Sequence, residues 1–312
     1  MAESINVKRR CALGAAAALG WALSAPSWAA GTQPWSPPPV GEGQIGASSA
    51  QAGVVTVLAR GRKDGMGAGL WIRNDGARPL RAVQSVVRGM WLGKAEAFFV
   101  RFQWSGELAP KAWAFVGATS FDLLGAAAPE PVAALSVEVL HARADGSQAG
   151  PEAPWSVSAS ALAALAAEME SGVDADAARA RAYAKGKGGG VPMVAGFAKM
   201  WAKPGRNPYD PRELNVAFAW RGAAAGPVEL KSLKATFFQS PSLAAFLRVE
   251  AQGAWTALPG ARGLALVSFG FPQASADARA AFEAKARGHG VDVERGYVDP
   301  VHPEGARAPS KG

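Results

Sequence analysis

The sequence predicts a mainly β protein. It is expected to contain two tandem antiparallel β-sandwich (Ig-like) domains, joined by a short helical connector and followed by a C-terminal helix. Three observations support this prediction. Short β-rich runs separated by turn residues fill two regions of the chain, helix-forming sequence lies between and after them, and the second β-rich region partly repeats the first.

The first 29 residues have the three parts of a secretory signal peptide. A basic run at residues 8–10 precedes an apolar run at about residues 11–23, which is too short to span a bilayer stably as a helix. Small residues at Ser27 and Ala29 suit cleavage after Ala29. We therefore expect residues 1–29 to be removed and the mature protein to be periplasmic or secreted; a buried N-terminal helix is the alternative.

The pair Arg9-Arg10, with Leu13 three residues beyond it, resembles a twin-arginine leader, the route by which folded proteins are exported. Ala12 stands where such leaders carry a bulky apolar residue, so an ordinary Sec signal stays open as the alternative. Cys11 lies at the start of the apolar run rather than at its end, which argues against a lipoprotein anchor.

Loss of this leader sets the chemistry of the mature chain. Cys11 is the only cysteine, so the remaining 283 of 312 residues exclude disulfides, thiolate nucleophiles, iron–sulfur clusters and cysteine zinc sites. The leader holds three bases and one acid, so the net charge falls from +8 to +6. A basic surface favours anionic envelope partners, with solubility as the simpler interpretation. No later segment is apolar enough to cross a membrane, so an integral membrane protein is not expected.

Residues 30–53 are rich in Pro, Gly and Ser, which predicts a disordered lead-in. The first sandwich domain is expected over residues 54–150, where turn residues such as Asp145-Gly146 separate β-rich runs. In the last run Leu135 and Val137 alternate with polar residues, as in a half-buried strand. The predicted strands are residues 54–60, 68–74, 80–87, 97–104, 112–117 and 135–142.

The helical connector is expected over residues 155–187 in two pieces. Leu162, Leu165 and Met169 lie at helical spacing in the first piece, which Gly172 is expected to end. The second piece begins with acids and ends with bases, a favourable placement along a helix dipole. Its basic residues suit an anion site, but a solvated helix face is the simpler interpretation. They are Arg179, Arg181, Lys185 and Lys187.

The second sandwich domain, with the C-terminal helix, is expected over residues 191–290, followed by a tail at 291–312. Here residues 244–248 align with 97–101, and 264–268 align with 113–117 at a slightly larger offset, as insertions in surface loops would produce. This pattern predicts a duplicated sandwich. The helix prediction rests on Ser275 as cap, Asp277 in the first turn, bases in the last turn and a glycine stop.

No nucleophile elbow, metalloprotease or dinucleotide motif is present, so the catalytic residues are unknown and no cofactor is expected. One dense group of metal-ligating residues lies near the C-terminus. Its spacing matches no metal motif, and an exposed polar segment is the simpler interpretation, so no metal is expected. The group consists of His289, Asp292, Glu294, Asp299 and His302.

Nine of the eleven tryptophans follow the leader. Most lie in strand patterns and are expected in the core, while Trp35 and Trp201 fall outside them and keep a carbohydrate-binding surface open. We expect an exported, non-enzymatic cell-envelope protein that binds a protein or glycan and no nucleic acid. The alternative is a secreted or periplasmic hydrolase of envelope or extracellular polymers. Acids near strand ends, namely Asp122, Glu138 and Glu250, select no catalytic pair.

Overall fold

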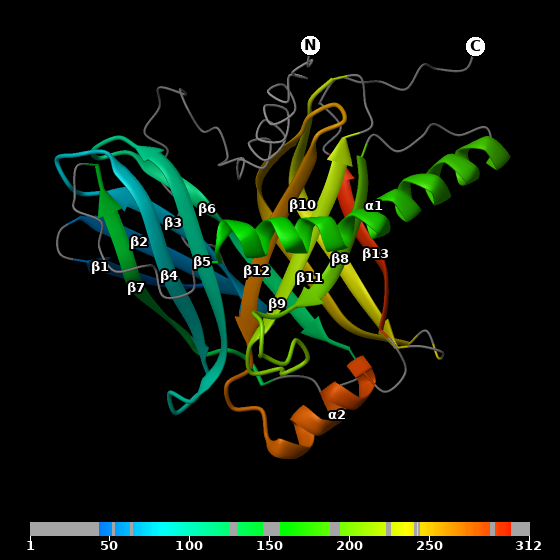
Figure 1. Cartoon of the computed structure of the whole chain (residues 1–312). Coiled ribbons are helices and arrows are strands. Elements are labelled where there is room, and N and C mark those ends of the chain that lie inside the picture. Colours follow the sequence, from blue (N-terminus) through cyan, green and yellow to red (C-terminus); the bar gives the residue numbers. More distant parts are fainter. Residues whose placement is uncertain are drawn as a thin grey trace, which may run out of the picture.

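Two antiparallel sheets form most of the protein, as the mainly β prediction requires (Figure 1). The computed structural model describes residues 44–51, 54–62, 65–124, 130–145, 157–187, 194–222, 226–239, 242, 244–287 and 291–300. The first sheet has the spatial order β1 (Gln44–Gln51), β2 (Val55–Arg62), β3 (Met66–Asn74), β6 (Trp113–Leu123), β11 (Ala244–Ala257), β10 (Val228–Gln239) and β13 (Val291–Pro300). The second sheet has the order β7 (Ala134–Ala144), β4 (Leu80–Met90), β5 (Glu96–Leu108), β12 (Arg262–Gly270), β9 (Leu214–Gly222) and β8 (Val194–Trp201).

The two halves of the chain follow the same strand order with the sheets exchanged. In the N-terminal half, β2 and β3 pair in the first sheet, β4 and β5 pair in the second, β6 returns beside β3, and β7 returns beside β4. In the C-terminal half, β8 and β9 pair in the second sheet, β10 and β11 pair in the first, β12 returns beside β9, and β13 returns beside β10. Strands β2 to β7 therefore correspond in order to strands β8 to β13.

Both sheets run without a break from one half to the other, because β6 pairs with β11 and β5 pairs with β12. The core between the sheets is likewise shared. Phe121 of β6 stacks on Phe269 of β12 with ring centroids 4.3 Å apart, and Phe98 and Phe271 meet its edges. The sequence predicted two tandem sandwich domains, and sequence spacing alone gives no sign of the aromatic contacts and strand pairings that join the two halves.

Two segments predicted to be irregular contain strands. Strand β1 lies within the predicted lead-in, and β13 lies within the predicted tail. Each pairs along its length with a strand of strong β pattern, β1 with β2 and β13 with β10. An extended segment of any composition can form main-chain hydrogen bonds with the strand at a sheet edge. Composition alone therefore does not reveal such strands.

Helix α1 (Ala159–Lys187) is continuous, in contrast to the two predicted pieces, and lies across the outer face of the second sheet (Figure 1). Leu165, Met169 and Val173 are buried against β8 and β9. Gly172 does not end the helix. A Cβ at this position would stand 2.4 Å from the Phe197 ring, so the glycine allows the helix to approach β8 closely.

Helix α2 (Ala276–Arg287) confirms the helix predicted after the last strand. The Ser275 hydroxyl accepts a hydrogen bond from the amide of Ala278 at 3.2 Å, as the sequence predicted for its N-cap. Phe282 is buried and meets the Phe246 ring edge-on at 5.6 Å, which fixes α2 against β11. Within the described residues, no helix is long and apolar enough to cross a membrane.

Candidate functional site

A large hollow opens where the two halves meet in the second sheet. Strands β5 and β12 pair over only three residue pairs, from Phe99–Gly270 to Arg101–Ser268. Beyond this point β5 continues with β4, and β12 continues with β9, so the two strands separate. Because β-strands twist, β5 follows the direction of its hairpin partner β4, and β12 follows the direction of its neighbour β9. In the first sheet β6 and β11 pair over six residue pairs, and they separate in the same way beyond Ala118–Gln252, where β6 continues with β3 and β11 with β10.

We call the resulting hollow the junction groove. A cavity of about 710 Å³ lies on the outer face, and a second one of about 250 Å³ continues between the separated strands. Both are lined by Arg101 and Gln103 of β5, Leu266 of β12, and Val157, which precedes α1. The combined space lies in the range of ligand sites in proteins.

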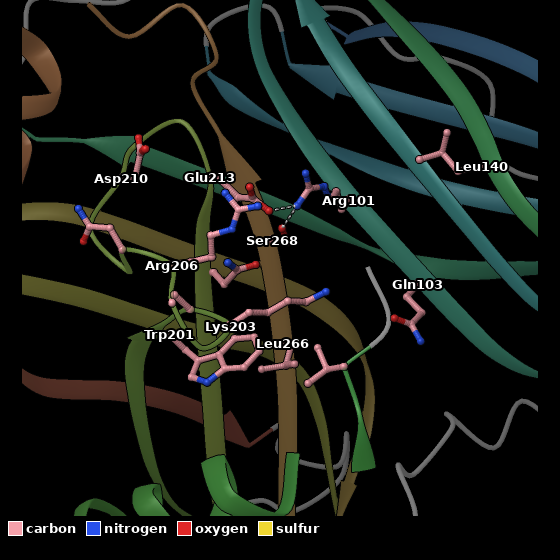
Figure 2. A pocket seen from close by; sticks show the side chains of 15 residues that line it. Arg101, Gln103, Leu140, Trp201, Lys203, Arg206, Asp210, Glu213, Leu266 and Ser268 are labelled. Atoms are coloured by element: carbon pink, nitrogen blue, oxygen red, sulfur yellow. Dashed lines mark hydrogen bonds and ion pairs between the residues drawn. The ribbon is translucent and has the colours of Figure 1, made fainter. Parts of the chain in front are cut away.

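The loop between β8 and β9 forms one wall of the groove (Figure 2). It opens with a tight turn in which the Arg206 amide donates to the Lys203 carbonyl at 3.0 Å. Pro204 and Gly205 hold the middle of this turn, and Gly205 has φ +79°, a conformation that glycine adopts without strain. The turn places the exposed side chains of Lys203 and Arg206 at the groove.

Helix α2 and the end of β12 anchor this loop. Arg287 donates to the Asn207 side-chain oxygen at 2.8 Å and lies over the Tyr209 ring. The Phe271 amide donates to the Pro211 carbonyl at 2.9 Å. These contacts hold the wall of the groove at three points, so its lining side chains project from a fixed backbone.

Two carboxylates line the groove, and both are paired with arginine. Glu213 accepts from Arg101 at 2.5 Å. Asp210 accepts from Arg212, whose guanidinium reaches it at 2.6 Å and whose backbone amide reaches it at 3.0 Å. The hydrogen bonds and charge of Arg212 lower the pKa of Asp210, against the opposing effect of its burial. The Asp210 carboxyl is therefore ionised at neutral pH.

Cations and hydrogen-bonding groups are left to face the groove. The side chains of Lys203 and Arg206 form no ion pair within the part of the chain that the structure describes. Gln103 and Asn215 add amides, and the half-buried Trp201 adds an aromatic surface. The groove is thus suited to a ligand that carries negative charge and many hydrogen-bonding groups, with an apolar face for Trp201.

Of the two tryptophans that the sequence leaves open for a carbohydrate-binding surface, Trp201 lines the groove. Trp104 and Trp220 are buried, as core packing predicted, while Trp71, Trp91, Trp113 and Trp255 are half-buried. Trp35 and Trp155 lie outside the described residues. Among the acids near strand ends, Asp122 and Glu138 are exposed, and Glu138 pairs with Arg88. Glu250 belongs to another face, described below.

The possible metal ligands near the C-terminus, at which the sequence predicts no metal, lie partly on β13. Asp292 and Asp299 lie near opposite ends of β13, opposite Phe238 and Ser232. Their backbone positions are therefore about 23 Å apart at the rise of an extended strand. Glu294 lies between them on the same strand, and His289 and His302 lie outside the described residues.

Sequence reasoning missed Arg101, Gln103, Asp210 and Glu213. A partial indication was available, because residues 203–213 combine three prolines, a glycine and several charges between two strands, as in an exposed loop that carries function. Nothing in the sequence indicates that this loop faces β5 of the other half.

No family model matches the chain, and no curated protein matches it. Solved structures with a partial likeness include the exo-chitosanase CsxA of Amycolatopsis orientalis, at 13% identity over 65% of this chain and 22% of that chain, with a TM-score of 0.19. Red sea bream transglutaminase matches at 10% identity over 72% of this chain and 28% of that chain, with a TM-score of 0.16. The chain spans less than a third of either protein, and likenesses this weak transfer no function.

Proposed function

We propose that this protein is an exported, non-enzymatic binding protein of the cell envelope whose junction groove binds a segment of an acidic glycan. The observation that carries the proposal is the combination of Trp201 with two cations, Lys203 and Arg206, that form no ion pair with any described residue, in one open groove. Aromatic faces stack on sugar rings, amides bond to hydroxyls, and cations bind sugar carboxylates or sulfates.

The architecture supports a second part of the proposal. The two halves are tandem repeats of an immunoglobulin-like sandwich unit, joined edge to edge. The shared strand order of β2–β7 and β8–β13, with matching sequence at residues 97–101 and 244–248, supports this duplication. Edge-to-edge joining makes the central strands of each sheet separate beyond their shared pairs, and the earlier separation, between β5 and β12, provides the proposed binding groove.

The alternative function, hydrolysis of a polymer, has one observation in its favour, because two carboxylates line the groove. A glycosidase also needs a protonated acid beside its carboxylate, which requires a raised pKa. The lowered pKa of Asp210 and the ion pair between Glu213 and Arg101 work against this role. We therefore expect no release of reducing ends from acidic polysaccharides, and release that is lost in Glu213→Gln would establish the enzyme instead.

Calorimetric titration tests the groove. An acidic oligosaccharide such as an oligogalacturonate should bind, while a neutral gluco-oligosaccharide of the same length should bind much more weakly. The double variant Lys203→Ala/Arg206→Ala should weaken binding by about tenfold or more, because two charge-assisted contacts are lost. Lys231→Ala, which removes an exposed cation from β10, is the matched control. Equal affinity in the double variant and the control would rule out the groove as the binding site.

Export is tested separately. The first residue of the mature protein should be Ala30, as read by N-terminal sequencing of the periplasmic or secreted fraction. Replacement of Arg9 and Arg10 by lysine should abolish export by the twin-arginine route and leave Sec export intact. A full-length protein retained inside the cell would contradict the proposed location.

A further inference from the structure

The outer face of the first sheet carries a second hollow, on the opposite side of the protein from α1. It has a volume of about 340 Å³ and lies over β2, β3, β6 and β11. Its floor consists of the small residues Gly67, Gly69 and Ala118. We call it the Arg60 trough, after the cation that lines one end. The trough shares no lining residue with the larger cavity of the junction groove, and it shares Ala118, Thr119 and Gln252 with the smaller one.

Arg60 is an unusual residue for an outer sheet face, because only 7% of it is exposed. Its guanidinium lies over the Trp71 ring, 5.0 Å from the centroid. Its buried Nε atom has no hydrogen-bond partner, and no carboxylate pairs with Arg60 in the described part of the chain. A guanidinium stays charged at any physiological pH, so burial without an anion is costly.

The corresponding position of the C-terminal half shows what such a cation can hold. Arg60 is the sixth residue of the eight-residue β2 and pairs with Gly69, while Lys199 is the sixth residue of the eight-residue β8 and pairs with Ala217. Lys199 forms an ion pair with the carboxylate of Glu168, which α1 lays over that face. No helix lies over Arg60 in the described structure. The same place in the repeat is therefore filled by a carboxylate in one half and left open in the other.

The far end of the trough has the opposite character. Glu250 lines it and accepts hydrogen bonds from Ser232 at 3.0 Å and from Gln252 at 3.1 Å. Ser120, opposite Glu250 on β6, adds an exposed hydroxyl. A carboxylate at this end attracts hydroxyl donors and repels a second anion. The ligand should therefore carry its negative charge at one end and hydroxyl groups at the other.

We infer that the Arg60 trough binds a small hydroxylated carboxylate, of the sugar-acid class, with its carboxylate on Arg60 and its hydroxyls toward Glu250 and Ser120. The volume suits one such molecule rather than a polymer chain. This inference does not depend on the function proposed for the junction groove.

Calorimetry with D-glucuronate, glucose and inorganic phosphate tests the trough in the full protein. D-glucuronate should bind, and glucose should bind at least about tenfold more weakly because it lacks the carboxylate. Arg60→Met should abolish glucuronate binding. Arg143→Met, which removes an exposed arginine from β7, and Lys203→Ala/Arg206→Ala should leave it unchanged, which separates this site from the groove. Absence of glucuronate binding, or binding that survives in Arg60→Met, overturns the inference, as does binding of phosphate alone.

A melting curve distinguishes a ligand role from a structural one. Without ligand, Arg60→Met should melt at the same temperature as the wild type or higher, because it removes a buried charge that lacks a partner. A marked fall in melting temperature would show instead that Arg60 serves the fold. The variant Ala118→Leu gives a second route, since it fills the trough floor while Arg60 stays in place. It should also block glucuronate binding, and unchanged binding would contradict the site.

Discussion

The outer faces of the two halves are built on matching strands but are covered differently. In the C-terminal half α1 lies over β8 and β9, and its acids pair with the cations beneath it, Glu168 with Lys199 and Asp174 with Arg221. In the N-terminal half no described helix lies over β2 and β3, and Arg60 lies over the Trp71 ring with no described carboxylate paired to it. The same strand order therefore carries one outer face covered by a helix (the closed face) and one that no described helix covers (the open face).

Arginines at a second matching position show the same contrast. Arg73 is the eighth residue of β3, and Arg221 is the eighth residue of β9. Arg221 receives its carboxylate from α1, whereas Arg73 pairs at 2.7 Å with Asp75, two residues further along its own chain. Neutralisation by a local turn leaves the face open, and neutralisation by a helix closes it. The difference between the halves thus lies in where the acids come from.

The largest expected effect comes from Phe121→Ala, which tests whether the halves share one core. Phe121 is 1% exposed and contacts Phe98 of its own half and Phe269 and Phe271 of the other. Its loss should lower the free energy of unfolding by about 3–5 kcal/mol. Urea unfolding should remain a single transition followed at the tryptophans. Two separate transitions, with only one of them shifted, would show that the halves fold independently.

A smaller effect is expected from Met169→Ala, which weakens the cover of the closed face. Met169 is fully buried between α1 and the second sheet, so the variant should cost about 2–4 kcal/mol. Hydrogen exchange should show faster exchange in α1 and little change in the first sheet. The exposed Ala164→Gly in the same helix is the control for helix propensity, expected to cost about 1 kcal/mol. Equal changes in both sheets would contradict a local role for α1.

The smallest effect is expected at Asp75, the local counterpart of the helix acids. Burial opposes its ionisation, but hydrogen bonds from Thr56 and Arg73, with the charges of Arg73 and Lys111, lower its pKa below the usual 3.8. Its stabilising contribution is therefore complete above about pH 4 and is lost as the pH falls through the lowered value. Asp75→Asn should cost about 1 kcal/mol at pH 7 and nothing at strongly acid pH, as measured by unfolding at each pH.

Asp174→Asn is the matched control for this prediction. The Asp174 side chain is 54% exposed, so its ion pair with Arg221 should contribute less than about 0.5 kcal/mol. If Asp75→Asn and Asp174→Asn had the same effect at every pH, the proposed difference between a partly buried local pair and a more exposed helix pair would be wrong.

The local elements could be predicted because their causes are local. The six strands expected between residues 54 and 142 correspond to β2–β7, and Ser275 caps α2 as its sequence position indicates. Alternating side chains and turn residues act over a few neighbours, so they can be read in order along the chain. The prediction that a helix ends at Gly172 was wrong, because a glycine that permits close packing cannot be told in sequence from one that ends a helix.

The binding features could not be predicted because each joins distant segments. Arg101 and Glu213 are 112 positions apart and meet only where β5 and β12 separate. Arg60 differs from other surface arginines only in being buried, and its burial depends on β3, β6 and the Trp71 ring beside it. Its position as the counterpart of Lys199 appears only once the strands are paired.

The sequence by itself determined the mainly β composition, the order of strands β2–β7, the helix α2, the repeated pattern and the single cysteine near the N-terminus. Only the tertiary structure decided that the two halves share both sheets, that β5 and β12 separate after three residue pairs, and that α1 covers the outer face of β8 and β9 while no described helix covers β2 and β3. Local patterns fix how a segment folds, because they act between neighbours. Edge pairing and helix docking depend on which surfaces meet, and those contacts form between residues far apart in the chain.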